Sequence, residues 1–260
     1  MPFEAIIYEK ENGIAVIRLN RPKVLNAMNK QLWLDFRAAL ADARSDAGVK
    51  ALIITGEGRA FSTGADLKES KTRTVEAYRD YLEELQQASR EIIRFEKPTI
   101  AAVNGYALGS GYELALACDI RLAAEDARIG SPEAKVTSSV TGGAMRLLQQ
   151  LVGPGKAKEL LFTAEFIDGK EAERIGLVNR AVKADALMAE AKSMAAKIAE
   201  NSAFSIRMIK KGLHMAQGEA SLEAIMDFEI EACLACVTTK ERQESLQDFA
   251  DRKKNRKETS

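Results

Sequence analysis

The sequence predicts an α/β protein in which an all-helical region follows the core. Two observations carry this prediction. Short apolar runs alternate with helical patterns along the first part of the chain, and from Lys156 onward helical patterns predominate. Strands joined by helical crossovers and followed by consecutive helices are typical of an α/β core with a helical extension. A chain of 260 residues also buries enough surface to fold without disulfides or a metal.

The chain begins with a predicted β-hairpin, a helix and a buried strand. Two β-rich runs, residues 6–8 and 14–19, flank Asn12-Gly13, a pair typical of tight turns. Apolar residues then recur at offsets of three and four from Leu32 to Ala43, which predicts an amphipathic helix. Residues 51–55 are almost entirely apolar and predict a strand buried on both faces.

The middle of the chain repeats the alternation of helix and strand. Residues 70–94 are largely polar with spaced apolar side chains, which predicts one exposed amphipathic helix. A buried strand is expected at 98–103, a helix at 112–118 and a short strand at 120–123. A further helix is expected to end where Gly153-Pro154-Gly155 interrupts the chain.

The last part of the chain is predicted to be mainly helical. The expected helices share apolar residues at helical spacing and lie at residues 156–163, 185–200, 202–217 and 219–236, with a last one ending near Lys254. Residues 177–182 form the only clear strand pattern there. No Pro-rich or Ser-rich linker is present, so we expect the helical tail to extend the same domain.

Charge and composition argue against several classes of protein. Lys and Arg total 38, and Asp and Glu total 38, so the formal net charge is zero. This balance disfavours a protein that coats nucleic acid or an anionic membrane through bulk charge. The N-terminus shows no signal-peptide pattern, and no run of about 18 uncharged apolar residues is present. We therefore expect a cytoplasmic protein without membrane spans.

The cysteines fit the same location. Cys118, Cys233 and Cys236 are an odd set, which suits reduced thiols. The last two form a C-x-x-C pair, but His214 is the single histidine and no second cysteine pair exists. Structural zinc normally takes four Cys or His ligands, so we expect packed helical thiols and no metal site.

Two glycine-rich segments follow predicted strands, at residues 61–68 and 104–111. Glycine at a junction between a strand and a helix lets the backbone turn tightly and present free N–H groups, which bind anions or a developing oxyanion. A dinucleotide fingerprint starting at Gly109 is excluded because Leu114 stands where it requires glycine. Each segment alone is weak evidence, since such glycines are commonly plain turn residues.

Two glutamates are the candidate acid–base groups. Glu113 lies in the first turn of the otherwise apolar helix expected at 112–118, and Glu133 follows Ser131-Pro132, which predicts a helix cap and first helical position. Glutamate near a helix start is favoured by the helix dipole without any function, and we prefer that interpretation for Glu133 considered alone. Glu113 stands out because its surroundings are apolar. Together the two carboxylates form a hypothetical acid–base pair.

Four segments together closely resemble the crotonase superfamily, and the branch most similar in appearance is enoyl-CoA hydratase. They are Arg21–Met28, Gly64–Lys68, Asn104–Leu114 and Ser131-Pro132-Glu133. The resemblance covers essentially the whole chain. It implies a ββα spiral core over residues 1–196 that binds acyl-CoA. It also implies a helical region over 197–260 that packs at the interface of a homotrimer or of a hexamer built as a dimer of trimers.

The resemblance also implies site residues. The backbone N–H groups of Ala65 and Ser110 match the oxyanion hole, which holds the thioester oxygen. Glu113 matches the residue that activates water at Cβ, and Glu133 the residue that exchanges a proton at Cα. The positions matched to the CoA and substrate site are Lys23, Val24, Leu25, Ala65, Asp66, Leu67, Lys68, Gly109, Thr141 and Arg252. No cofactor is implied, because coenzyme A is part of the substrate.

Some positions depart from the pattern of the superfamily. Ser110 replaces the usual glycine, Val140 and Thr141 stand where Pro-Gly is common, and Cys233 replaces an aromatic residue beside the adenine. We therefore expect an acyl pocket that accepts a polar or cyclic group.

Alternative functions follow from the same resemblance. The presence of both glutamates favours hydration over a Δ3,Δ2-enoyl-CoA isomerase, which can use the Glu133-type residue alone, or another enolate reaction of the superfamily. An RNA-binding homologue is a different class of protein. The basic stripe it would need is Arg207, Lys210, Lys211 and His214, which we interpret as a solvated helix face. Residues 251–258 carry five positive and two negative side chains, and we expect them near CoA phosphates.

Overall fold

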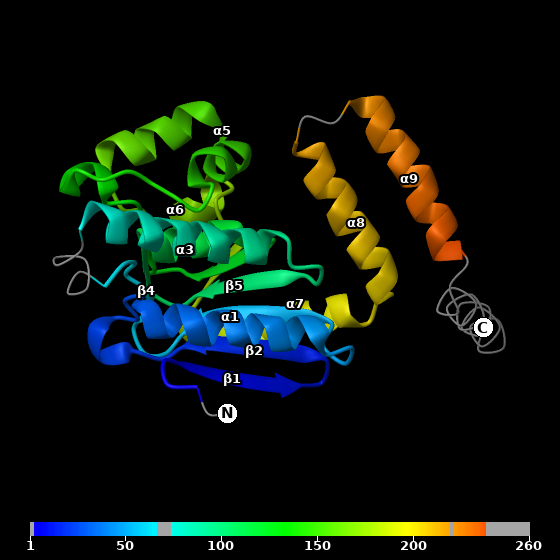
Figure 1. Ribbon diagram of the computed structural model, residues 1–260, viewed down its shortest axis with the longest axis horizontal. Coiled ribbons are helices and arrows are strands. Elements are labelled where there is room, and N and C mark those ends of the chain that lie inside the picture. The colour runs from blue at the N-terminus through cyan, green and yellow to red at the C-terminus, as the bar shows by residue number, and fades with distance from the viewer. Residues whose placement is uncertain (1–2, 67–73, 219–220, 238–260) are drawn as a thin grey trace. The chain divides into compact units, whose positions relative to one another are not determined.

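The computed structural model describes residues 3–66, 74–218 and 221–237 (Figure 1). The chain divides into two compact units, Met1–Ile198 and Ala199–Ser260, and each is described by itself. Within the described residues, no helix has both the length and the apolar character that a membrane crossing requires.

A six-stranded sheet forms the centre of the first unit. Its strands, in spatial order, are β1 (Ile6–Glu11), β2 (Ile14–Leu19), β3 (Ala51–Gly56), β5 (Thr99–Val103), β7 (Ile120–Ala124) and β9 (Arg180–Val182). Only the β1–β2 pair is antiparallel. The hairpin prediction is confirmed, because Asn12 and Gly13 both adopt positive φ angles, as a type I′ turn requires. Strands β3 and β5 are buried throughout, which explains their continuous apolar character.

A second, three-stranded parallel sheet was not predicted. It consists of β4 (Ala60–Ser62), β6 (Tyr106–Leu108) and β8 (Arg128–Gly130). Each strand has three residues, too few for alternation to distinguish a strand from a loop. Each follows a strand of the large sheet and precedes a helical segment. The chain therefore winds as repeated ββα units, and the predicted ββα spiral is confirmed.

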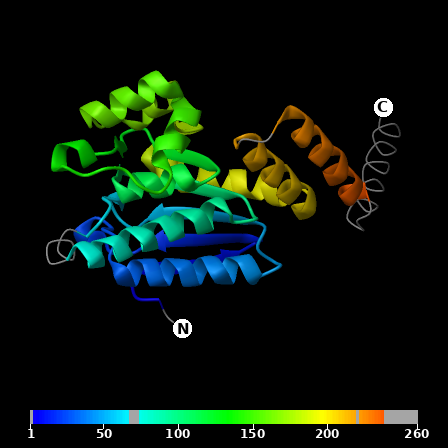
Figure 2. The ribbon, with the colours of Figure 1, turned by 45° about the horizontal axis from the view of Figure 1, so that its top comes forward.

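The first unit contains both long and short helices. They are η1 (Pro22–Val24), α1 (Lys30–Ser45), α3 (Val75–Ile93), α4 (Ser110–Ala117), η2 (Glu133–Val136), α5 (Ala144–Thr163), α6 (Gly169–Arg174), η3 (Ala184–Ala186) and α7 (Leu187–Ala199). Figures 1 and 2 show α1 and α3 side by side, and the guanidinium of Arg37 in α1 contacts the carboxylate of Glu91 in α3 at 2.6 Å. The helix expected at 70–94 is confirmed over Val75–Ile93, and residues 70–73 lie outside the described residues.

One predicted boundary needs correction, one helix was not predicted, and one predicted interruption is confirmed. The strand expected at 177–182 is reduced to β9, because the N–H groups of Leu177 and Val178 both donate to the Ala172 carbonyl at the end of α6. Helix α6 itself was missed because it spans only six residues. The expected interruption near residue 153 is present as a kink in α5, where Gly153 has a φ of +77°.

The second unit contains the predicted helices at 202–217 and 219–236 in slightly shorter form. They are α8 (Ala203–Ala216) and α9 (Leu222–Val237), which pack against each other. A Cβ at Gly212 of α8 would lie 2.9 Å from the Phe228 ring of α9, so glycine permits this close contact. The helix expected to end near Lys254 lies outside the described residues.

Helix α4 has a central position in the first unit. All of its residues are buried, and it contacts α3, α5, β4 and β6. The buried guanidinium of Arg121 donates hydrogen bonds to the Cys118 carbonyl at 2.6 Å and to the Leu177 carbonyl at 2.9 Å. A cation beside a helix C-terminus satisfies its free carbonyls and interacts favourably with the helix dipole. Arg121 therefore holds α4 in place from one end, while the other end carries Ser110 and Glu113.

Candidate active site

The turns that follow β4 and β6 lie directly against each other. Gly64 has a φ of +88°, and a Cβ at this position would lie 2.8 Å from the Leu108 oxygen and 3.0 Å from the Ser110 nitrogen. Only glycine permits so close an approach, which explains the residue type at position 64. The two predicted oxyanion residues, Ala65 and Ser110, are therefore neighbours in space.

The backbone around Ala65 and Ser110 leaves their amides in suitable positions to donate. Met28 N donates to Gly64 O at 2.7 Å, and Asp66 N donates to Met28 O at 3.1 Å. Met28 and Ala65 thus form a parallel bridge, whose two hydrogen bonds use Gly64 and Asp66, the residues on either side of Ala65. The Ala65 N–H takes no part in this bridge. Ser110 is the first residue of α4, and an N–H at this position has no intrahelical carbonyl partner. Two such amides together can stabilise an oxyanion.

Glu113 is a buried carboxylate with well-defined partners. It lies in the first turn of α4, as predicted, and only 3% of the residue is exposed. The Thr141 N–H donates to Oε1 at 2.5 Å, and the Thr141 hydroxyl donates to Oε2 at 2.6 Å. Burial raises the pKa of Glu113 above its ordinary value, while the two hydrogen bonds from Thr141 oppose that rise. A carboxylate with a raised pKa is suited to proton transfer near neutral pH.

Glu133 is brought to the same place by a different element. It is the first residue of η2, and the Ser131 hydroxyl donates a hydrogen bond to its Oε2. The prediction that Ser131 caps a helix is wrong, because Pro132 occupies the cap position and Ser131 bonds the glutamate side chain instead. A Cβ at Gly109 would lie 2.8 Å from Glu133 Oε1, so this carboxylate lies against the turn that precedes Ser110.

The structure therefore gathers both glutamates and both candidate amides around one turn. The Glu113 N–H donates to the Gly109 carbonyl at 2.9 Å, and the charge of Glu133 adds to the rise in the pKa of Glu113. A carboxyl group whose pKa is raised by burial and by a second carboxylate is typical of acid–base catalysis. The arrangement is suited to moving protons beside a developing oxyanion, and the individual roles stay predictions.

The residues predicted to line the CoA site lie partly beside this turn. Lys23 and Val24 belong to η1, and the Thr63 N–H donates to the Leu25 carbonyl at 3.1 Å. Asp66 is paired with Arg21 at 2.9 Å. The segment of residues 21–28 is thus attached to the strand-to-loop junction at 63–66. Leu67, Lys68 and Arg252 lie outside the described residues, as does the side chain of Cys233.

Two asparagines support the site without having been singled out by sequence. Asn26 is fully buried; its amide nitrogen donates to the Ala60 carbonyl at 2.7 Å, and its oxygen accepts from Arg21 N at 2.8 Å. The Asn104 amide donates to the Gly58 carbonyl at 2.8 Å. Each side-chain amide thus donates a hydrogen bond to a backbone carbonyl in or beside β4. Both asparagines lie in segments that carry the resemblance, Arg21–Met28 and Asn104–Leu114. A short amide side chain beside a turn is otherwise too common to identify such residues.

Metal binding finds no support among the described residues. No group of three or more His, Cys, Asp or Glu side chains there could hold a metal ion. Cys118 is buried, and its thiol contacts the Leu114 carbonyl within α4. The side chains of Cys233 and Cys236 lie outside the described residues, so their predicted packing stays a prediction.

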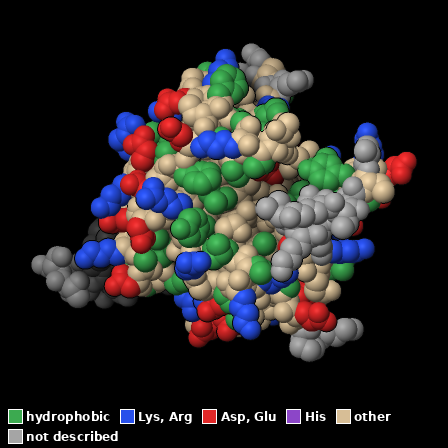
Figure 3. Space-filling model, turned by 90° about the vertical axis from the view of Figure 1, so that its left-hand side faces the viewer, with side chains coloured by type: hydrophobic (Ala, Val, Ile, Leu, Met, Phe, Trp, Pro, Cys, Tyr) green, Lys and Arg blue, Asp and Glu red, His purple; other side chains and the backbone are tan. Residues whose placement is uncertain are grey.

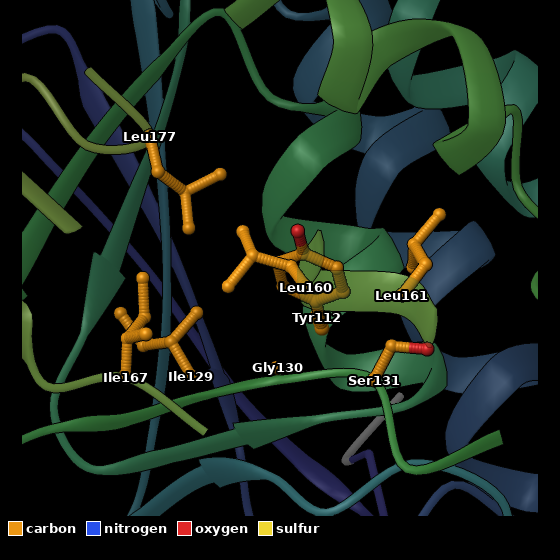
Figure 4. A pocket seen from close by; sticks show the side chains of 8 residues that line it. All are labelled: Tyr112, Ile129, Gly130, Ser131, Leu160, Leu161, Ile167 and Leu177. Atoms are coloured by element: carbon orange, nitrogen blue, oxygen red, sulfur yellow. The ribbon is translucent and has the colours of Figure 1, made fainter. Parts of the chain in front are cut away.

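A small pocket is lined by residues that include Tyr112 and Ser131, which are close to the two glutamates in sequence (Figure 4). Its lining is mainly apolar and comprises Tyr112, Ile129, Gly130, Ser131, Leu160, Leu161, Ile167 and Leu177. Neither Glu113 nor Glu133 lines it. Burial raises the pKa of Tyr112, so its hydroxyl stays neutral at physiological pH. This pocket therefore has no acid–base pair of its own.

The chain matches known proteins over nearly its full length. The family model described as "Enoyl-CoA hydratase/isomerase" matches residues 9–259. The chain is 38% identical to a crotonyl-CoA hydratase of Syntrophomonas wolfei, covering 98% of both chains. It is 37% identical to a short-chain-enoyl-CoA hydratase of Clostridium acetobutylicum, covering 98% of this chain and 97% of that one. The crystal structure of an enoyl-CoA hydratase from Bacillus anthracis superimposes with a TM-score of 0.93 at 33% identity, covering 96% of this chain and 97% of that chain.

Proposed function

Since this chain belongs to the enoyl-CoA hydratase/isomerase family and acts as an enoyl-CoA hydratase, we propose that Glu113 and Glu133 carry its proton transfers. The observation that supports this assignment is the buried Glu113 carboxylate beside Glu133 and the turn that carries the Ser110 amide. Two carboxylates in such unequal surroundings are suited to opposite roles, one as base and one as acid.

The proposed reaction adds water across the α,β double bond of an acyl-CoA thioester. Glu113 takes a proton from the water as its oxygen forms a bond to Cβ. The electron pair of the double bond moves to the thioester oxygen, which the Ala65 and Ser110 N–H groups hold as an enolate. The enolate then collapses, and Cα takes a proton from protonated Glu133. The enzyme ends with the proton on Glu113, and exchange with solvent restores the starting state.

The geometry suits a syn addition. Glu133 Oε1 lies against Gly109, and Glu113 N donates to the carbonyl of that same glycine. The two carboxyl groups come from different elements, α4 and η2, and the charge of Glu133 acts on the Glu113 carboxyl. Neighbouring carboxyl groups of this kind can deliver the hydroxyl and the proton to the same face of a substrate. The proposed steps form a C–O bond and transfer protons without a net change of oxidation state, so they use no cofactor beyond the CoA of the substrate. We place the enzyme in the cytoplasm, in keeping with its three cysteines.

A panel of enoyl-CoA esters tests the reaction. We expect products that have gained one water, scored by mass spectrometry, because both glutamates are available. The names of the relatives make short esters such as crotonyl-CoA the first substrates to try. The departures at Ser110 and Thr141 predict faster turnover of hydroxylated or cyclic esters than of crotonyl-CoA. Products of unchanged mass with a moved double bond would instead identify an isomerase.

We also propose assembly into a homotrimer or a dimer of trimers. Large hydrophobic side chains are exposed on the second unit at Ile209, Leu213, Met226 and Ile230, and on the first at Val136, Met145 and Phe162. Figure 3 shows hydrophobic side chains gathered on one face of the molecule, with charged groups around them. Exposed apolar surface of this kind is typical of sites that another chain covers.

Sedimentation of the intact protein tests the assembly. We expect a mass of three or six chains for the parent, and dissociation in Ile230→Asp, because the new charge would be buried at an interface. Glu231→Gln, on the neighbouring exposed position of α9, is the matched control and should keep the parental mass. A parent protein that sediments as a monomer at micromolar concentration would contradict the proposal.

A further inference from the structure

Thr141 is held at the start of α5 by its backbone. It lies in the connection between η2 and α5, where the Ala144 N–H donates to the Thr141 carbonyl at 2.9 Å. Gly142 and Gly143 follow with φ angles of +59° and +80°, which turn the chain into the helix. A Cβ at Gly142 would lie 2.9 Å from the Ser89 oxygen, so the turn is also closely packed against α3. The position of Thr141 is therefore set by two helices.

From this position Thr141 contacts both oxygens of the Glu113 carboxylate. Its N–H donates to Oε1 at 2.5 Å, and its hydroxyl donates to Oε2 at 2.6 Å. An ionised carboxylate only accepts hydrogen bonds, so the hydroxyl proton must point at Glu113. Two bonds from one residue to the two oxygens fix the plane of the carboxylate. Each oxygen keeps a second acceptor site for water.

We propose that the Thr141 hydroxyl is a positioning residue that holds Glu113 oriented and ionised for taking a proton from water. This inference rests on the proposed function and adds to it. Thr141 is also a predicted residue of the substrate site, and its hydrogen bonds to Glu113 point to a role beside the base in addition. The backbone N–H is supplied by any residue except proline at this position, so the side-chain hydroxyl is the part specific to threonine.

The surroundings of Glu113 explain why this hydroxyl matters. Burial and the charge of Glu133 both raise the pKa of Glu113, and the hydrogen bonds from Thr141 lower it. Tyr112 also interacts with this carboxylate, and its hydroxyl stays neutral because burial raises its own pKa. Removing the hydroxyl leaves burial and Glu133 unchanged. The pKa of Glu113 should then rise. A smaller fraction of Glu113 would be ionised at low pH, so the rate of hydration should fall first on the acid side of the pH profile.

The test compares Thr141→Val, which replaces the hydroxyl by a methyl group, with Thr141→Ser, which keeps it. Loss of one hydrogen bond to a charged carboxylate should raise the pKa of that group by about one unit. We therefore expect the apparent pKa on the acid side of the kcat/KM profile for crotonyl-CoA hydration to rise by about one pH unit in Thr141→Val. At pH values below that pKa, kcat/KM should be about tenfold lower than in the parent. Thr141→Ser should keep the parental pKa. Ser139→Ala, which removes an exposed hydroxyl from the same connection, is the matched control.

A second measurement does not depend on turnover. A ¹³C titration of the Glu113 carboxyl carbon, assigned by its loss in Glu113→Gln, should show the same upward move in Thr141→Val and none in Thr141→Ser. Binding of butyryl-CoA and thermal unfolding of each variant confirm that the fold is kept. The role of Thr141 would be overturned if the Glu113 pKa were the same in the parent and in Thr141→Val. It would also be overturned if Thr141→Ser raised that pKa as much as Thr141→Val. A parent that titrates as expected but adds no water to any ester would contradict the proposed function instead.

Discussion

The Glu113→Gln variant is expected to hydrate crotonyl-CoA about 10²–10⁴-fold more slowly than the parent. Glutamine keeps the size of the side chain and can accept a hydrogen bond, but it cannot take a proton from water. Because Glu113 is almost completely buried, no solvent group can easily replace it as base. Steady-state measurement of kcat and KM by the loss of crotonyl-CoA absorbance gives the result directly. We expect the loss in kcat, with the affinity for butyryl-CoA largely unchanged.

Stability provides a control on this variant. The pKa of Glu113 is raised in the folded protein, so keeping the group ionised costs folding free energy at pH values above that pKa. The cost disappears as the pH falls below the ordinary pKa of an unfolded glutamate. Glu113→Gln should therefore unfold at an equal or higher temperature than the parent at pH 8, and the advantage should be lost at pH 4. Loss of activity with markedly lowered stability would point to misfolding instead of a missing base.

Glu133→Gln is expected to give a loss of the same order for a different reason. This residue supplies the proton to Cα, and its Oε1 lies beside the turn that carries Ser110. The exposed Glu165 provides a matched control, and Glu165→Gln should keep parental turnover. If Glu113→Gln or Glu133→Gln retained near-parental kcat, the role assigned to that residue would be wrong.

The second large effect is expected from Gly109→Ala, with a fall in kcat/KM of about 10²–10³-fold. Gly109 has a φ of +53°, and an added Cβ would lie 2.8 Å from Glu133 Oε1. The flexible carboxylate can move away, but it then leaves the position from which it protonates Cα. A change in φ would also redirect the neighbouring Ser110 N–H. The strained backbone should also cost about 1–3 kcal/mol of folding stability. The loss of kcat/KM should be seen under conditions in which the variant is fully folded.

Two other glycines separate the effect of backbone strain from the effect of the contact with Glu133. Gly153 has a φ of +77° but no atom within 4 Å of an added Cβ, so Gly153→Ala tests backbone strain alone. Gly155 has neither a positive φ nor a close neighbour, so Gly155→Ala tests the substitution itself. We expect Gly153→Ala to lose stability and keep kcat/KM, and Gly155→Ala to keep both. A Gly109→Ala enzyme with parental kcat/KM would show that this turn does not position Glu133.

Long elements with a clear period were predictable, and short ones were not. Helix α1 and strand β3 each carry their apolar pattern within the element, and the turn at Asn12-Gly13 needs only its two residues. The three-residue strands of the small sheet carry no such pattern. They form because the neighbouring large-sheet strands place them side by side, which is a property of the whole fold.

The sequence by itself determined the α/β class, the positions of most helices and strands, and, through its resemblance to a known superfamily, the two glutamates and the glycine-rich turns. Local hydrophobic period and turn chemistry are properties of a few consecutive residues, so they can be read without a fold. The tertiary structure alone decided that Thr141 bonds Glu113 across 28 positions and that Gly109 lies against Glu133. It also decided that the pKa of Glu113 is raised, because its burial and the charge beside it depend on residues distant in sequence.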